Sequence, residues 1–129
     1  MGFVKPEATE FVGQAHRLIG RADRMLAVGL NEDAARTAYL ACFHVAQAYI
    51  FERTDKTSKS HHGVQTEFFR LTREDDRADA GLRRFLSKAY EFKSVADYFT
   101  GEQAVTSVED AAAAVATAKN FMSHFGAII

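Results

Sequence analysis

The sequence has one cysteine, Cys42, and one proline, Pro6, in 129 residues. A lone cysteine excludes an internal disulfide, and it excludes a zinc site built on pairs of cysteines. A reducing compartment such as the cytoplasm fits this composition best. No stretch approaches the ~20 apolar residues of a membrane-spanning helix, and the opening MGFVKPEATEF lacks the long apolar run of a signal peptide. We therefore expect a cytoplasmic protein without a membrane segment.

The chain also lacks an excess of charge of either sign. It holds 16 Lys and Arg against 17 Asp and Glu, a formal net charge of −1 at pH 7. No overall field then draws in nucleic acid, so any anion-binding site has to be a local patch. The length suits one domain over residues 1–129, and it is sufficient for a core that needs no disulfide or metal.

Strand-like alternation of apolar and polar residues is missing, while alanine, leucine and glutamate are plentiful. Apolar residues recur instead at helical spacing, which predicts an all-α protein. Because the connections are short, we expect a bundle of about five helices. The expected helices cover residues 6–28, 31–53, 60–72 and 82–99, and the last begins near residue 106.

Capping signals mark where several of these helices begin or end. Asn31 and Ser60 are suitable N-caps, and Gly29 is a natural stop for the helix before it. Thr106 and Glu109 have the spacing of a capping box. The inward face of the last helix is expected to hold Val108, Ala111, Val115, Ala118, Met122 and Phe125.

The second helix is apolar over most of its circumference, which predicts a central position in the bundle. Its polar residues Arg36, Thr37, His44 and Gln47 fall within about one quarter of the turn. This polar stripe has two interpretations. It is either an edge that faces solvent or another subunit, or one wall of a polar cleft.

Residues 54–64, TDKTSKSHHGV, combine hydroxyls, lysines and two adjacent histidines. With Ser60 as N-cap, His61, His62 and Gly63 lie in the first turn of the third helix. Unpaired backbone N–H groups and the positive end of the helix dipole let such a turn bind phosphate. Gly63 has no side chain to block the approach of an anion.

Three cations, Arg53, Lys56 and Lys59, flank this turn in the sequence. A histidine at the positive end of a helix stays neutral near pH 7, which suits general acid or base catalysis. RNA cleavage without metal needs a base, an acid and cations on the phosphate. The alternative is a basic loop with a capping serine. A metal site is disfavoured, because adjacent histidines point in different directions and no HExxH pattern is present.

The segment YEFKSVADYF of the fourth helix places Lys93 four residues before Asp97, where the two can form an ion pair. Tyr98 adds a hydroxyl and a ring beside them. By itself this segment is typical of a structural helix.

Taken together, three segments resemble the HEPN domain (higher eukaryotes and prokaryotes nucleotide-binding), most of all its short, stand-alone prokaryotic branch. That branch shows R-x-x-Y-Y-A-x-F, K-x-H-x-G-V and R-x-x-A-D-Y motifs. They correspond to Arg36 through Phe43, Lys59 through Val64, and Lys93 through Tyr98. The resemblance extends from about residue 7 to residue 125.

The resemblance implies an all-α up-and-down bundle, commonly a homodimer, with RNA or a nucleotide as ligand. We expect no cofactor and no metal. Many relatives are metal-independent endoribonuclease toxins, and many are encoded beside a minimal nucleotidyltransferase that acts as antitoxin. On this reading the catalytic candidates are His61, His62 and Arg53, and the phosphate- or RNA-binding candidates are Lys56, Lys59, Gly63, Arg36 and His44.

The chain departs from the family pattern at two points. Active relatives carry an arginine followed after a short gap by a histidine, whereas seven residues separate Arg53 from His61 and Arg36 from His44. Lysine, at Lys93, replaces the arginine of the A-D-Y helix and loses its bidentate fork. Two functions stay open: an RNA-cleaving enzyme, and a non-catalytic nucleotide- or RNA-binding module that works through a partner. The aromatic residues Tyr39, Phe43, Tyr49 and Phe51 further suggest more apolar helix surface than a monomer needs, and hence a two-fold dimer.

Overall fold

The computed structural model describes residues 4–98 and 106–129, with side chains described for 4–91 and 106–129. The described residues form helices and connecting turns, with no strand. This confirms the predicted all-α bundle of five helices. The helices are α1 (Pro6–Ala27), α2 (Asn31–Thr54), α3 (His61–Arg73), α4 (Ala80–Tyr98) and α5 (Val108–Ala127).

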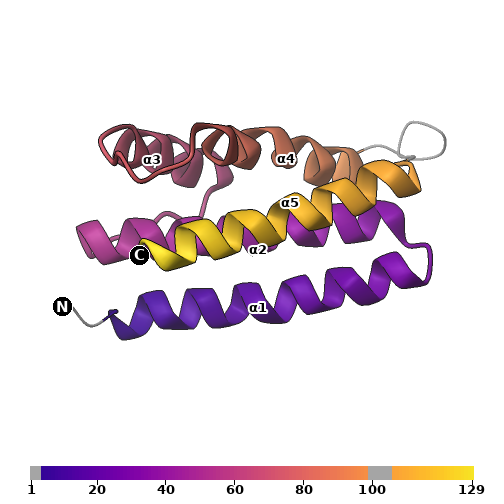
Figure 1. Ribbon diagram of the computed structural model, residues 1–129, viewed down its shortest axis with the longest axis horizontal. Helices are drawn as coiled ribbons and strands as arrows, with labels where there is room; N and C mark the ends of the chain where they lie inside the picture. The colour runs from indigo at the N-terminus through magenta and orange to yellow at the C-terminus, as the bar shows by residue number, and fades with distance from the viewer. Residues whose placement is uncertain (1–3, 99–105) are drawn as a thin grey trace.

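Helix α2 is the central element and contacts each of the other four helices. In Figure 1, α1 runs along one side of α2, α3 and α4 lie on the opposite side, and α5 crosses α2 between them. The start of α1 is fastened to the end of α2, because the Lys5 backbone N–H donates to Glu52 Oε2 at 2.9 Å and Lys5 Nζ donates to Asp55 Oδ1 at 2.7 Å. Within the polar stripe of α2, Thr37 contacts Met25 of α1, His44 contacts Phe11 of α1, and Gln47 contacts Ser58 of the α2–α3 loop.

Burial of α2 follows its composition. Its alanines, among them Ala41 and Ala46, are 0% exposed, and small side chains let neighbouring helices approach closely. Each fully buried large side chain stabilises the fold by about 1.5–3 kcal/mol relative to exposure. The largest fully buried side chains are Tyr39, Tyr49, Phe68, Phe121 and Phe125.

The N-cap residues of two helices differ from the sequence-based prediction. Helix α5 is capped by Ser107, whose Oγ accepts from the Asp110 N–H at 3.0 Å. Thr106 is not the cap, because its own backbone N–H donates to Glu32 Oε2 at 2.9 Å and holds it outside the helix. Val108 then becomes the first helical residue and is 58% exposed, so its predicted inward position was wrong. The other five predicted inward residues of α5, from Ala111 to Phe125, are buried.

At the start of α2, Leu30 takes the N-cap position and Asn31 is the first helical residue. The Asn31 side chain caps nothing, and its Oδ1 is buried without a hydrogen-bond partner. The preceding turn explains the shift. Gly29 adopts φ 82°, and the Leu30 N–H donates to the Met25 carbonyl at 2.9 Å, so Leu30 still belongs to the turn that closes α1. The Leu30 carbonyl in turn accepts from the Ala34 N–H at 2.9 Å and begins α2.

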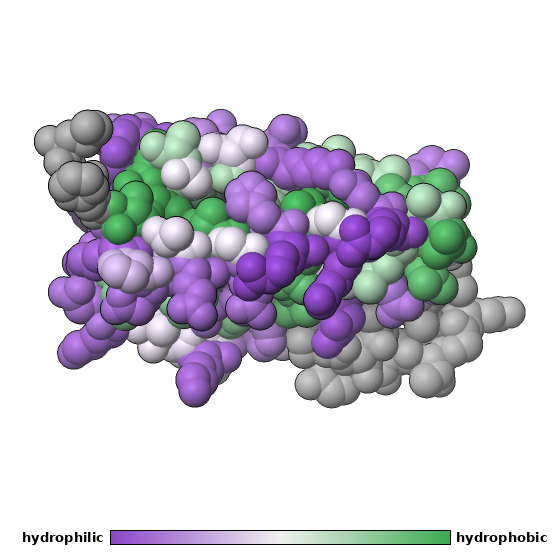
Figure 2. All heavy atoms as spheres, turned by 90° about the horizontal axis from the view of Figure 1, so that it is seen from below, coloured by the Kyte–Doolittle hydropathy of each residue, from purple (hydrophilic) through white to green (hydrophobic). Residues whose placement is uncertain are grey.

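Helix α1 turns an apolar side to the core and a charged side to water. Ala15 and Ala22 are fully buried, whereas Arg17, Arg21 and Arg24 are exposed at one-turn spacing. Figure 2 shows the strongly hydrophilic band that crosses this face of the molecule. In the described part of the chain, no helix is both long enough and apolar enough to cross a lipid bilayer.

Candidate functional site

His61 is the first residue of α3, and its half-buried imidazole sits among aromatic rings from α2 and α4. Its ring centroid lies 4.6 Å from that of Phe43, 5.5 Å from Tyr39 and 5.4 Å from Tyr90. The Nδ1 atom lies 2.7 Å from the Tyr39 hydroxyl, a hydrogen-bond distance. These contacts fix the plane and the orientation of the imidazole.

Tyr39, the partner of His61, is completely buried in the middle of α2. Burial raises the pKa of its phenol well above the ordinary value, and interaction with the Gln65 side chain opposes this only in part. The phenol therefore stays protonated at physiological pH, since desolvation disfavours the phenolate. The group that His61 Nδ1 meets is consequently a neutral hydroxyl.

His44 forms a second ordered imidazole on the polar stripe of α2. Its Nδ1 lies 2.7 Å from Gln47 Oε1, and Gln47 Nε2 donates to the Ser58 carbonyl at 2.9 Å. Burial lowers the pKa of His44, and the Gln47 hydrogen bond opposes this shift. His44 is therefore neutral at pH 7.

The structure brings the rings of His44 and His61 against one side chain, Phe43, although 16 intervening residues separate the two histidines in the sequence. Both rings contact Phe43, with centroid distances of 5.5 Å for His44 and 4.6 Å for His61. Gln47 also ties His44 to the loop that leads into His61. The predicted candidate His62 lies beside this pair with an exposed side chain.

The lack of a side chain at Gly63 matters because two serine side chains fill that space, and not because it leaves room for an anion as predicted. An added Cβ would lie 2.4 Å from Ser58 Oγ and 2.7 Å from Ser60 Oγ. The predicted cap is confirmed, because Ser60 Oγ accepts from the Gly63 N–H at 2.9 Å. The chain's own serines occupy the space that the sequence had suggested for a phosphate, so an anion would have to compete with Ser60 for this N–H.

Lys56 and Lys59 are exposed on the loop between α2 and α3. Lys56 lines a cleft of about 440 Å³ between this loop, the end of α2 and α3, together with Ser58 and Arg70. Arg70 is already paired with Glu67 at 2.8 Å. The loop thus offers cationic groups on the surface beside the two histidines.

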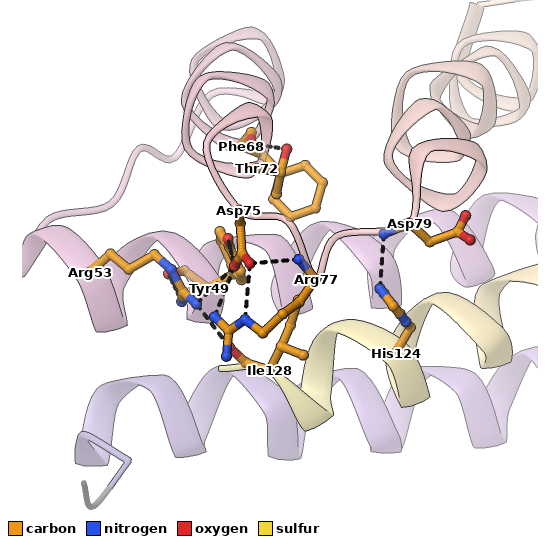
Figure 3. A network of polar contacts seen from close by, with 9 residues as sticks. All are labelled: Tyr49, Arg53, Phe68, Thr72, Asp75, Arg77, Asp79, His124 and Ile128. Carbon is orange, nitrogen blue, oxygen red and sulfur yellow. Dashed lines mark hydrogen bonds and ion pairs between the residues drawn. The ribbon is translucent and has the colours of Figure 1, made fainter.

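Arg53 is not near the histidines. It follows Phe43 by ten positions, or ~15 Å along α2. Its Nη2 donates to the Ile128 carbonyl at 2.8 Å and lies 3.5 Å from Asp75 Oδ2, while the guanidinium stacks 3.5 Å from the Tyr49 ring centroid (Figure 3). Arg53 therefore joins the end of α2 to the chain after α5 and to the α3–α4 connector.

Asp75 is the centre of this network, which we call the Asp75 network (Tyr49, Arg53, Asp75, Arg77 and Ile128; Figure 3). The Tyr49 hydroxyl donates to Asp75 Oδ2 at 2.6 Å, and Arg77 donates to both carboxylate oxygens. Burial, followed by the bond to Asp75, raises the pKa of Tyr49 to about 12. Hydrogen bonds from Arg77 hold the pKa of Asp75 far below the ordinary carboxyl value.

The remaining predicted residues are placed only in part. Arg36 is half-buried on α2, on the same stripe as His44. Lys93, Asp97 and Tyr98 belong to α4 by their backbone, and their side chains are not among those that the structure describes. Among the described residues, no group of three or more His, Cys, Asp or Glu side chains is placed to hold a metal ion.

Sequence reasoning missed the roles of Gln47, Tyr39 and Tyr90. Gln47 had a usable signal, because it follows His44 by three residues and so shares its helix face. Tyr90 had none, since it reaches His61 from a separate helix. Tyr39 belonged to a recognised motif, but its partner could not be read from spacing within that motif.

A comparison of the sequence with models of known families finds one that matches. The model of the HEPN domain matches residues 8–127, nearly the whole chain. The chain belongs to the HEPN domain family. Comparison with curated proteins finds no match. In this HEPN chain, the R-x-x-Y-Y-A-x-F and K-x-H-x-G-V motifs supply Tyr39, Phe43 and His61, which meet in one aromatic cluster.

Proposed function

We propose that this HEPN protein acts on RNA in the cytoplasm and cleaves its backbone without a metal ion, at the junction of α2, α3 and the loop between them. The observation that carries the proposal is the His61 imidazole, held by Tyr39 Oη 2.7 Å from Nδ1 and packed on the same Phe43 ring as His44. Two fixed imidazoles at one surface are suited to the proton transfers of phosphodiester cleavage.

Most of the predicted residues have a place in this proposal. His61 transfers a proton at the reacting phosphate, with His62 as the exposed alternative. Lys56, Lys59 and Arg36 hold phosphates by charge, and the N–H of Gly63 is available only if Ser60 releases it. Arg53 has no catalytic part, because the Asp75 network occupies its guanidinium.

The biological setting follows from the family resemblance. We propose that the protein is a toxin-like endoribonuclease of a toxin–antitoxin pair, with a nucleotidyltransferase as antitoxin and a homodimer as the active form. A nucleotidyltransferase reading frame adjacent to this gene would support the pairing. Co-purification of the two proteins is the direct test.

Activity is tested by incubating the purified protein with mixed RNA in the presence of a chelator, so that metal-dependent nucleases are silent. We expect cleavage that is lost in His61→Ala and in His61→Gln and retained in His62→Ala. Circular dichroism checks that each variant is folded. Loss with His62→Ala and retention with His61→Gln would transfer the role to the neighbouring histidine, and cleavage by the variant with both replaced would refute the proposal.

The phosphate contacts have their own test. Replacing Lys56 and Lys59 together with alanine should weaken the binding of all RNA sequences about equally, because phosphate contacts carry no base information. Binding should also weaken as salt rises. A change in sequence preference would argue against a role on the backbone.

The second candidate function is a non-catalytic RNA- or nucleotide-binding module that works through a partner. Two observations favour it: Arg53 is engaged in the Asp75 network, and Ser60 caps the N–H that a phosphate would use. Binding of RNA without cleavage, with and without the partner, would support the module and exclude the enzyme.

A further inference from the structure

The hydrogen bonds around His44 determine which of its ring nitrogens carries the proton. Gln47 Nε2 donates to the Ser58 carbonyl, and a carbonyl can only accept, so the Gln47 amide is oriented with Oε1 toward His44. Oε1 is also an acceptor, so the His44 Nδ1 at 2.7 Å has to be the donor. In neutral His44 the lone pair is therefore on Nε2.

This Nε2 has no hydrogen-bond partner among the described residues and is not completely sealed from water. The one described side-chain N or O atom that is sealed from water without a partner is Asn31 Oδ1. The imidazole as a whole is half-buried. A ring nitrogen that is unprotonated and not sealed from water, on an otherwise packed imidazole, is the arrangement that a proton acceptor requires.

Two aromatic rings contact the His44 imidazole. Phe11 of α1 stacks on it with a centroid distance of 6.3 Å and an interplanar angle of 14°, and Phe43 meets it edge-on at 5.5 Å. A ring flip would point a carbon atom at Gln47 Oε1 and lose the bond. Burial also lowers the pKa of His44, which keeps Nε2 unprotonated near neutral pH.

We propose that His44 is the general base of the cleavage site and that Gln47 is the positioning residue that keeps its lone pair on Nε2. This inference rests on the proposed function. His44 Nε2 takes the proton of the 2′-hydroxyl, the O2′–P bond forms, the P–O5′ bond breaks, and His61 gives a proton to the leaving 5′-oxygen. The products are a 2′,3′-cyclic phosphate and a free 5′-hydroxyl, and proton exchange with water restores both histidines.

The same hydrogen bonds couple the base to the basic loop. Gln47 reaches the loop through the carbonyl of Ser58, whose side chain also packs against Gly63. A loop displaced from this position leaves the Gln47 amide free to rotate and His44 free to change tautomer. His44 is thus ordered only while the loop that carries Lys56 and Lys59 is in place.

Activity measurements form the first test. His44→Gln should lower RNA cleavage about 10²–10⁴-fold, the usual contribution of a general base. Gln47→Glu places a carboxylate on Nδ1–H, which raises the pKa of His44 and should move the acid limb of the pH–rate profile to higher pH. His16→Gln and Gln14→Glu, the same changes at exposed positions of α1, are the matched controls and should leave the profile unchanged.

Nitrogen-15 NMR of the imidazoles provides a readout that does not need activity. We expect neutral His44 to carry its proton on Nδ1, and to lose this preference in Gln47→Ala. A proton on Nε2 in the unmodified protein would overturn the inference whatever the activity. Cleavage that survives His44→Gln but not His61→Gln would overturn it too, and would leave the proposed function standing. An unmodified protein that cleaves no RNA would instead refute the proposed function, and the base role with it.

Discussion

Among the glycines that the structure describes, Gly63 has the least room for an added side chain. A Cβ there would approach Ser58 Oγ to 2.4 Å, closer than real Cβ contacts come. Ser58 and Ser60, whose hydroxyls would clash, both belong to the short loop whose Ser58 carbonyl accepts the hydrogen bond from Gln47. Relief of the clash therefore requires the loop to move away from α3.

We predict that Gly63→Ala destabilises the fold by about 1–3 kcal/mol, the usual cost of overpacking. The measurement is urea unfolding followed by circular dichroism. Gly20→Ala is the control, because the nearest atom to its added Cβ is the flexible Arg24 Nη1 at 3.9 Å. Alanine in a helix interior should stabilise by up to about 1 kcal/mol there. Equal effects of the two substitutions would contradict the proposed packing.

The role of a residue could be predicted where its contacts are with residues close in the sequence. The Ser60 cap follows from residues within one turn, and it is confirmed. The position of Arg53 depends on the Ile128 carbonyl, 75 residues away in the sequence. The surroundings of His61 depend on Tyr90, from another helix. Neither contact leaves a trace in the spacing of neighbouring residues.

The start of α5 provides a test at the scale of the element. Thr106 and Ser107 are adjacent hydroxyl residues, and only the Ser107 side chain caps the helix. Ser107→Ala should cost about 1 kcal/mol of unfolding free energy. Thr106→Ala should cost much less, since Thr106 contributes its backbone N–H and that group is unchanged. A larger loss of unfolding free energy in Thr106→Ala than in Ser107→Ala would support the capping box predicted from the sequence.

The connector between α3 and α4 is fastened by the Asp75 network, which makes it sensitive to acid. The pKa of Asp75 is lowered in the folded state, chiefly by Arg77. The carboxylate therefore contributes its full stabilisation above about pH 5, and the contribution is lost as pH falls through and below the unfolded carboxyl pKa of about 3.9.

Asp75→Asn removes this charge while keeping the shape of the side chain. We predict a loss of about 1.5–3 kcal/mol at pH 7, the worth of hydrogen bonds to a charged group, and a smaller difference from the unmodified protein at pH 3. Urea unfolding at both pH values measures it. The exposed neighbour variant Asp76→Asn should behave like the unmodified protein at both. A constant difference across the pH range would show that the Asp75 carboxylate is not the acid-sensitive group.

Helix types and most boundaries could be predicted because amphipathic periodicity and caps are local properties. The errors fall at helix starts, where a competing contact decides. Thr106 is held by Glu32, and the turn through Gly29 moves the cap of α2 to Leu30. Such competition depends on which elements meet in space, and a single segment does not contain that information.

At the scale of the whole molecule, the homodimer stays a prediction, but its basis in the sequence needs correction. Tyr39 and Tyr49 are 0% exposed and Phe43 is 6% exposed within the single chain, so these aromatics supply no interface. Multi-angle light scattering at micromolar concentration measures the assembly. We expect the mass of a dimer, and a monomer at all concentrations would refute it.

Because α2 contacts all four other helices, its amide protons cannot reach water unless the whole bundle opens. Amide hydrogen exchange in the core of α2 should then proceed only through global unfolding, and it should slow or quicken with every stabilising or destabilising substitution anywhere in the chain. Helix α3 has fewer such neighbours, and its exchange can proceed through a partial opening that leaves α1, α2 and α5 assembled. Residues 58–63, which precede and begin α3, would thus open and close repeatedly while α1, α2 and α5 stay folded.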